Sequence, residues 1–130
     1  MSKPWSEIAA FYHQFAGGRD ENPYWLACCG IGSLASTISQ NRLSTSLFGW
    51  TSMHDLCIQQ CDLEAFSGPY LRIAPLHSGH VEFCLIDTPS VARQWRREVD
   101  PMDTTKRFVG FLAQIKWTDE DTAASLLLWP

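Results

Sequence analysis

The chain has 130 residues and a formal charge of −4 at pH 7, with 45% hydrophobic and 18% charged residues. This length predicts a single domain, residues 1–130, with enough buried surface to fold unaided. The mild negative charge argues against a general nucleic-acid binder, which would carry a basic face, and no apolar run approaches the roughly 20 residues that a membrane span needs.

The cysteine pattern predicts a reduced, cytoplasmic protein. There are five cysteines, an odd number, and two of them are adjacent. The N-terminus turns polar within a few residues, so we expect no signal peptide. Free thiols fit this pattern better than a disulfide framework does. The cysteines are Cys28, Cys29, Cys57, Cys61 and Cys84.

Two helices are predicted ahead of the first strand. The first begins near Pro4, a residue favoured in a first helical turn, and ends at Gly17-Gly18. The helical spacing of apolar residues predicts the second over residues 22–39. Gly30 and Gly32 lie inside it and each costs about 1 kcal/mol relative to alanine, so we expect close packing there against a neighbouring element.

From Leu43 onward the apolar residues alternate with a period of two, which is typical of strands. Phe48 and Trp50 share one face, and Leu56 and Ile58 share a face beyond an intervening turn. This pattern predicts a β-hairpin.

A polar loop over residues 60–69 leads into a second predicted hairpin, with strands over 70–76 and 81–87. A three-residue loop with Gly79 in the left-handed conformation keeps the apolar residues of both strands on one face. The expected cross-strand pairs are Leu71 with Leu85 and Ile73 with Phe83.

Residues 93–99 fit a third strand with Trp95 and Val99 facing inward, and a helix is the alternative. Asp103 is then expected to cap a helix that continues through Lys116. Its apolar residues recur at helical spacing, which is the strongest helical signal in the chain. They are Phe108, Phe111, Leu112 and Ile115.

The predicted fold is therefore α+β, with an N-terminal helical hairpin, an antiparallel meander sheet of four to five strands and a C-terminal helix packed on the sheet. The tail, residues 118–130, fits either a short helix or a strand. The helix stripe and the strand face predict a core made of Phe83, Leu85, Trp95, Phe108, Phe111, Leu112 and Ile115.

The sequence contains no phosphate loop, dinucleotide fingerprint, nucleophile elbow or metalloprotease motif, and we predict no catalytic residue and no cofactor. A zinc site is the main metal alternative, built from His54, Cys57 and Cys61 and completed by His77 and His80. Because the Cys57–Cys61 spacing lacks the tight C-x2-C knuckle and cysteine is often a plain buried hydrophobe, we predict no metal.

Two further groups of residues are candidates for a catalytic site. Cys84 could pair with His80 or His77 as a nucleophile, but a thiol buried on a central strand would be inert. Glu82 and Asp87 could form a carboxylate pair, and a solvated sheet edge explains them equally well.

The outward row Arg72, Glu82, Arg96 and Glu98 carries alternating charges. Cross-strand pairing on a solvated face is one interpretation of this row. The other is a charged recognition surface, where complementarity gives specificity and fast association. Together with the two hairpin tips, the candidate partner-binding residues are Arg72, Glu82, Arg96, Met53, His54, His77 and His80.

A set of short motifs spans roughly the C-terminal half of the chain. They are Gly68-Pro69-Tyr70-Leu71-Arg72-Ile73, Val81-Glu82-Phe83, Asp87-Thr88, Arg93-Gln94-Trp95, and Arg107-Phe108 leading to Trp117. In this the chain resembles small bacterial proteins of immunity type. The resemblance implies a cytoplasmic protein that neutralises a cognate toxin or effector by occluding it.

We therefore expect a non-enzymatic module whose partner is a protein, such as a toxin encoded by a neighbouring gene. We expect no nucleic-acid or membrane partner. A secretion-chaperone-like adaptor is the first alternative. A small ligand-binding or hydrolytic α+β protein, with a pocket between helix and sheet, is the second. A binding module should show an exposed aromatic or charged patch, whereas an enzyme should show convergent His, Cys or carboxylate groups in a pocket.

Overall fold

The computed structural model describes residues 2–15, 22–62, 68–87, 89–118, 121–122 and 125. Within these residues it has three α-helices and a five-stranded antiparallel sheet, which confirms the predicted α+β class. The helices are α1 (Trp5–His13), α2 (Pro23–Ser39) and α3 (Thr104–Gln114). The strands are β1 (Phe48–Ser52), β2 (Asp55–Gln59), β3 (Tyr70–Pro75), β4 (Val81–Ile86) and β5 (Trp95–Val99). Short 3-10 helices are η1 (Arg42–Thr45), η2 (Val91–Arg93) and η3 (Pro101–Asp103).

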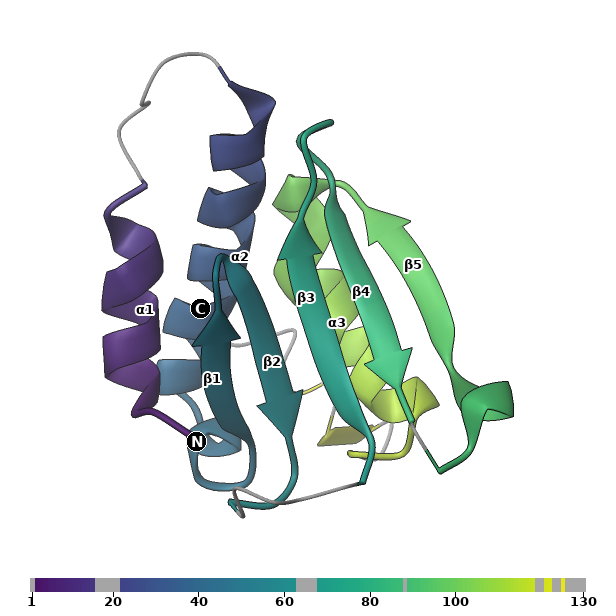
Figure 1. Ribbon diagram of the computed structural model, residues 1–130. Coiled ribbons are helices and arrows are strands. Elements are labelled where there is room, and N and C mark those ends of the chain that lie inside the picture. Colours follow the sequence, from purple (N-terminus) through teal and green to yellow (C-terminus); the bar gives the residue numbers. More distant parts are fainter. Residues whose placement is uncertain are drawn as a thin grey trace.

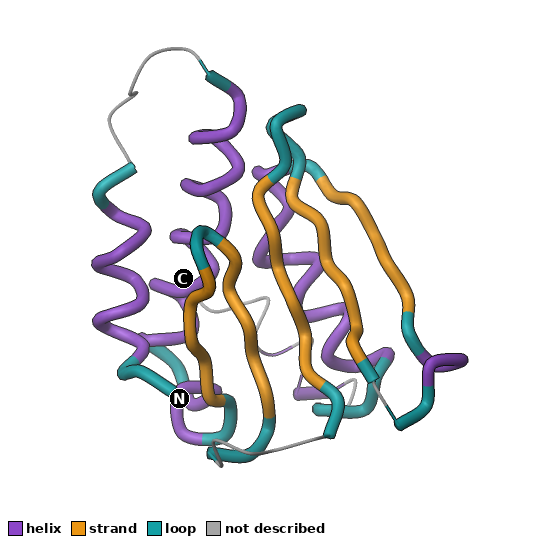
Figure 2. Tube along the Cα trace, in the orientation of Figure 1, coloured by secondary structure: helices purple, strands orange, loops and turns teal. Residues whose placement is uncertain are grey.

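The sheet is a meander in which the strands follow one another in the order β1-β2-β3-β4-β5. All three α-helices lie on the same side of it (Figure 1). α1 and α2 form the N-terminal hairpin, and α3 packs behind the second half of the sheet (Figure 2). The opposite face of the sheet has no described helix over it, which makes this a two-layer fold.

The β3–β4 hairpin has the predicted register. Leu71 pairs with Leu85 and Ile73 with Phe83, and all are buried. Gly79 has a φ of 95°, a conformation that only glycine adopts without strain. The left-handed glycine and the alternating strands therefore fix the same pairing.

β5 settles the choice between strand and helix for the third segment. Trp95–Val99 is a strand whose Val99 is buried and whose Trp95 is half-buried, but Arg93 belongs to η2 and not to the strand. The prediction that the strand starts at Arg93 was wrong, because the chain first forms a 3-10 turn and the strand begins at Trp95.

The predicted C-terminal helix is present as α3, with two corrections at its ends. The Asp103 side chain makes no capping hydrogen bond. The helix stops at Gln114, because Lys116 has a φ of 63° and the N–H of Trp117 donates to the carbonyl of Leu112 at 2.8 Å. This is the Schellman ending, normally built on glycine. Of the tail, Asp121, Thr122 and Ser125 are helical, and the remainder beyond Thr118 lies outside the described residues.

The first strand begins later in the structure than the sequence pattern indicated. Strand pairing begins at Phe48, not at Leu43. The Asn41 side chain accepts the N–H of Leu43 at 2.7 Å and starts η1, so Leu43 is buried by a 3-10 turn.

Asn22 caps α2 by accepting the N–H of Tyr24 at 3.0 Å. The predicted end of the first helix at Gly17-Gly18 lies outside the described residues.

The core occupies the space between the helices and the sheet. Five of the predicted core residues are buried, and Trp95 and Ile115 pack against them half-buried. The ring of Phe111 lies 5.0 Å from that of Phe83 and 4.9 Å from that of Trp95. α3 is therefore fastened to β4 and β5 by aromatic contacts.

Close packing explains the glycines of α2, and it gives opposite expectations for two glycine-to-alanine changes. A Cβ on Gly30 would lie 2.8 Å from the carbonyl oxygen of Pro101, whereas one on Gly110 of α3 would meet nothing within 4 Å. Gly110→Ala should stabilise the protein by up to about 1 kcal/mol. Gly30→Ala should destabilise it by about 1–2 kcal/mol, because the clash is with backbone. Urea denaturation of both variants measures this, and a stabilised Gly30→Ala would show that α2 and η3 are further apart.

Candidate functional site

The open face of the sheet, the face without a described helix, gathers most of the predicted binding residues. Because side chains alternate along a strand, the register places every second residue of each strand on this face. One row runs straight across all five strands. It consists of Trp50, Cys57, Arg72, Cys84 and Arg96.

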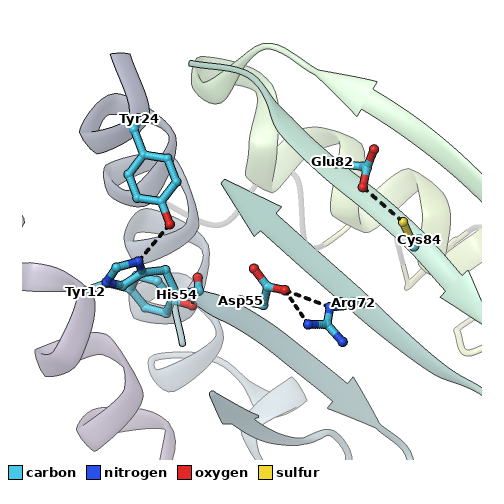
Figure 3. A network of polar contacts seen from close by, with 7 residues as sticks. All are labelled: Tyr12, Tyr24, His54, Asp55, Arg72, Glu82 and Cys84. Atoms are coloured by element: carbon cyan, nitrogen blue, oxygen red, sulfur yellow. Dashed lines mark hydrogen bonds and ion pairs between the residues drawn. The ribbon is translucent and has the colours of Figure 1, made fainter. Parts of the chain in front are cut away.

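The charges on the open face are held in ion pairs. Arg72 donates through Nε and Nη2 to Oδ2 of Asp55, both at 2.7 Å (Figure 3). This hydrogen bond is the main cause that raises the pKa of Arg72 above its ordinary value. Arg96 lies 3.4 Å from Glu82, so the predicted residues Arg72, Glu82 and Arg96 do share one face. Asp55 was missed as the partner of Arg72, because its position opposite β3 follows only from the β2–β3 register.

The third pair joins the hairpin tip to the edge strand. Nδ1 of His80 lies 2.9 Å from Oε1 of Glu98. Both side chains are about half exposed, at 48% and 52%, so the pair contributes little stability. His80 is therefore available at the surface beside the row of charges.

Cys57 and Cys84 flank Arg72 on the open face, and both thiols are poorly suited to nucleophilic chemistry. They are buried although no described helix covers them. Loss of hydration raises the pKa of Cys57 to about 11, against the opposing effect of Arg72, and burial also raises the pKa of Cys84. The Cys84 thiol donates to Oε1 of Glu82 at 3.4 Å (Figure 3) and to neither candidate histidine.

This burial predicts which thiols react in the native protein. All five cysteines are free, but only Cys29 and Cys61 are partly exposed. Alkylation with iodoacetamide at pH 8, followed by peptide mass spectrometry, should modify these two quickly. The buried thiols should react slowly, since burial also raises the pKa of Cys28, to about 12, and the thiolate is the reactive form. All five should react after denaturation, and native labelling of Cys57 as fast as Cys61 would contradict the arrangement.

Two aromatic side chains, Trp50 and Tyr70, lie beside the ion pairs on the open face. The rings of Trp50 and Tyr70 are 5.7 Å apart, and both residues are half-buried, as are Phe48 and Ile86. Aromatic side chains of this kind, apolar with a polar tip, are favoured anchors in protein interfaces. Trp50 and Tyr70 were not among the predicted binding residues. The signal available in the sequence was their alternation with buried residues along each strand.

One of the predicted hairpin-tip residues, His54, packs against the N-terminal helices. His54 lies among the rings of Phe11, Phe15, Tyr24 and Trp25, with centroid distances of 5.2–6.3 Å. Its Nδ1 is 2.7 Å from the Tyr24 hydroxyl (Figure 3). These contacts fasten the β1–β2 tip to the two N-terminal helices.

Two further contacts complete this aromatic cluster. The Tyr12 hydroxyl donates to the carbonyl oxygen of His54 at 2.8 Å, and burial raises the pKa of Tyr12 well above its ordinary value. His77 stacks on Tyr24 at 5.0 Å and so attaches the second hairpin tip to the same helix. Met53, next to His54 at the β1–β2 tip, is strongly exposed, at 86%.

Metal-ligating residues do not converge in the described part of the chain. No three His, Cys, Asp or Glu side chains there lie close enough to hold an ion. His54 is inside the aromatic cluster whereas Cys57 is on the open face. The sheet therefore separates two of the residues that the zinc alternative required.

One cavity is at the C-terminal end of α3. Its volume is about 300 Å³, and Leu85, Asp87, Arg93, Trp95 and Trp117 contribute to its lining. Asp87 is buried and lies 3.9 Å from Nε of Arg93. The described lining of this cavity holds one carboxylate and neither histidine nor cysteine.

No family model matches this sequence, and the comparisons with curated proteins and with solved structures found no match. None of the described helices combines the length and the apolar character that crossing a membrane requires.

Proposed function

We propose that this protein binds another protein through the open face of its sheet, as a non-enzymatic module of immunity type that occludes a bacterial toxin or effector. One observation carries the proposal. A five-stranded sheet presents a face without a described helix, on which ion-paired charges lie beside half-buried aromatic rings.

The side chains of the open face are already ordered before a partner binds. The charged side chains are held by partners on neighbouring strands, so little conformational entropy remains to be lost on association. Charges of both signs give specificity through complementarity, and Trp50 with Tyr70 supplies apolar area that a partner would desolvate.

A cytoplasmic location belongs to this proposal. It is supported by the five free cysteines, because disulfides are the rule in oxidising compartments and free thiols in the cytoplasm. The toxin-neutralising role is supported by the resemblance of the C-terminal half to immunity-type proteins and by the formal charge of −4.

Rescue by co-expression tests the function. The toxin or effector encoded beside this gene is expressed with the wild-type protein or with the double variant Glu82→Arg/Arg96→Glu. Exchanging these two residues keeps the ion pair and the net charge but reverses the charge pattern of the open face. We expect the wild type to restore growth and the exchanged variant to weaken rescue at least tenfold at equal protein level.

The matched control makes the same exchange on the helix side. Glu7 and Arg42 are both exposed there, and Glu7→Arg/Arg42→Glu should rescue as well as the wild type. Full rescue by the open-face variant, or turnover of a small substrate by purified protein that binds no partner, would overturn the proposal.

A further inference from the structure

The outer edge of β5 is an unpaired strand edge. β5 is the last strand of the sheet, and no other described strand pairs beyond it (Figure 1). At the opposite edge, the N–H of Lys3 donates to the carbonyl of Gly49 at 2.9 Å and partly covers β1. An exposed strand edge presents a row of backbone donors and acceptors that can pair with another chain.

The register shows which backbone groups point outward. In the β3–β4 hairpin the N–H of Leu76 donates to the carbonyl of His80, and hydrogen-bonded pairs alternate along an antiparallel ladder. Even-numbered residues of β4 therefore face β3 and odd-numbered ones face β5. Since Glu82 pairs with Glu98 and Cys84 with Arg96, the backbone groups of Arg96 and Glu98 point away from the sheet.

Two guanidinium groups are held in place beside this edge. Arg97 lies over the ring of Trp95 at 5.4 Å, and its Nη1 donates to the outward carbonyl oxygen of Arg96 at 2.9 Å. Arg107 lies over the ring of Phe111 at 5.1 Å, and Phe111 contacts Trp95. Two rings in contact, Trp95 and Phe111, therefore each support one of the cations.

Neither cation has an ion-pair partner among the described residues. The carboxylates nearest Arg97 in the sequence have other contacts, since Glu98 pairs with His80 and Asp100 accepts the N–H of Met102. Rigid guanidinium groups with unused donors bind carboxylates strongly and with defined geometry.

We propose that the β5 edge binds an extended acidic segment of a partner protein, which adds to the sheet as a sixth strand with its carboxylates on Arg97 and Arg107. A second copy of this chain is a less complementary occupant, because β5 carries two arginines against one glutamate. The inference stands apart from the open-face proposal, since Trp95, Arg97, Phe111 and Arg107 lie on the helix side of the sheet.

A labelled peptide of alternating glutamate and valine is the probe, with the lysine–valine peptide of the same length as its counterpart. Fluorescence anisotropy with the full chain should show at least tenfold tighter binding of the glutamate peptide. Binding should slow hydrogen exchange of the Arg96 and Glu98 amides at least tenfold, which contact by side chains alone would not do.

Two variants separate the backbone contribution from the charge contribution. Glu98→Pro removes one outward N–H without touching the β4 ladder, and Glu98→Gln removes the same carboxylate but keeps the N–H. The proline variant and Arg97→Gln/Arg107→Gln should each bind the glutamate peptide at least tenfold more weakly, with Glu98→Gln within twofold of the wild type. Equal binding of both peptides, no protection of the two amides, tighter binding of a single-stranded oligonucleotide, or a dimer in sedimentation would each overturn the proposal.

Discussion

Phe111→Ala is expected to lower the free energy of unfolding by about 3–5 kcal/mol, the usual cost of emptying a buried phenylalanine site. Phe111 is 5% exposed and contacts Phe83 and Trp95, so its loss leaves a cavity where α3 meets β4 and β5. The Arg107 guanidinium also loses the ring beneath it. Urea denaturation followed by tryptophan fluorescence gives the value.

Met102→Ala is the matched control for that change. Met102 is also a large apolar residue near α3, but it is 91% exposed, so its truncation should change stability by less than about 0.5 kcal/mol. A loss below about 1 kcal/mol for Phe111→Ala would mean that α3 does not pack on the sheet in this way.

His54→Ala is expected to destabilise the protein by about 2–3 kcal/mol, a large effect for a residue in a hairpin turn. Its imidazole contacts four rings, and each aromatic pair contributes about 0.5–1.5 kcal/mol. The Tyr24 hydroxyl also loses its partner, which Tyr24→Phe tests separately at about 1 kcal/mol. Chemical denaturation is the measurement.

His80→Ala is the control, because His80 is another hairpin-tip histidine with an exposed ion pair. Its loss should cost less than about 1 kcal/mol. If His54→Ala were no more destabilising than His80→Ala, the aromatic cluster would not be what holds the β1–β2 tip to the helices.

Local pattern and turn chemistry were enough to predict the β3–β4 hairpin. Its alternating apolar residues and Gly79 independently require one register, and the structure has that register. The 3-10 turn at Leu43 was not predictable from periodicity, since a single buried residue beside a strand extends the same alternation. The early end of α3 arises from Lys116 in a conformation normally taken by glycine, so no residue type signalled it.

The candidate site was harder to predict than the fold, because it depends on contacts between distant segments. Arg72, Glu82 and Arg96 share a face as alternation predicts, but the pairing of Arg72 with Asp55 requires the β2–β3 register. His54 lies among rings from both N-terminal helices. The sequence alone does not reveal how those helices cross the hairpin tip.

If the partner lies on the open face, site-specific photo-crosslinking will trap it there. Ala74 is in β3 on the open face, between Asp55 and Glu82 in adjacent strands, and Ala10 is exposed on α1. A benzophenone amino acid is placed at either alanine, and the protein is irradiated with the toxin encoded beside its gene. We expect a crosslinked complex from position 74 and none from position 10. A crosslink from position 10 without one from position 74 would place the partner on the helices and not on the open face.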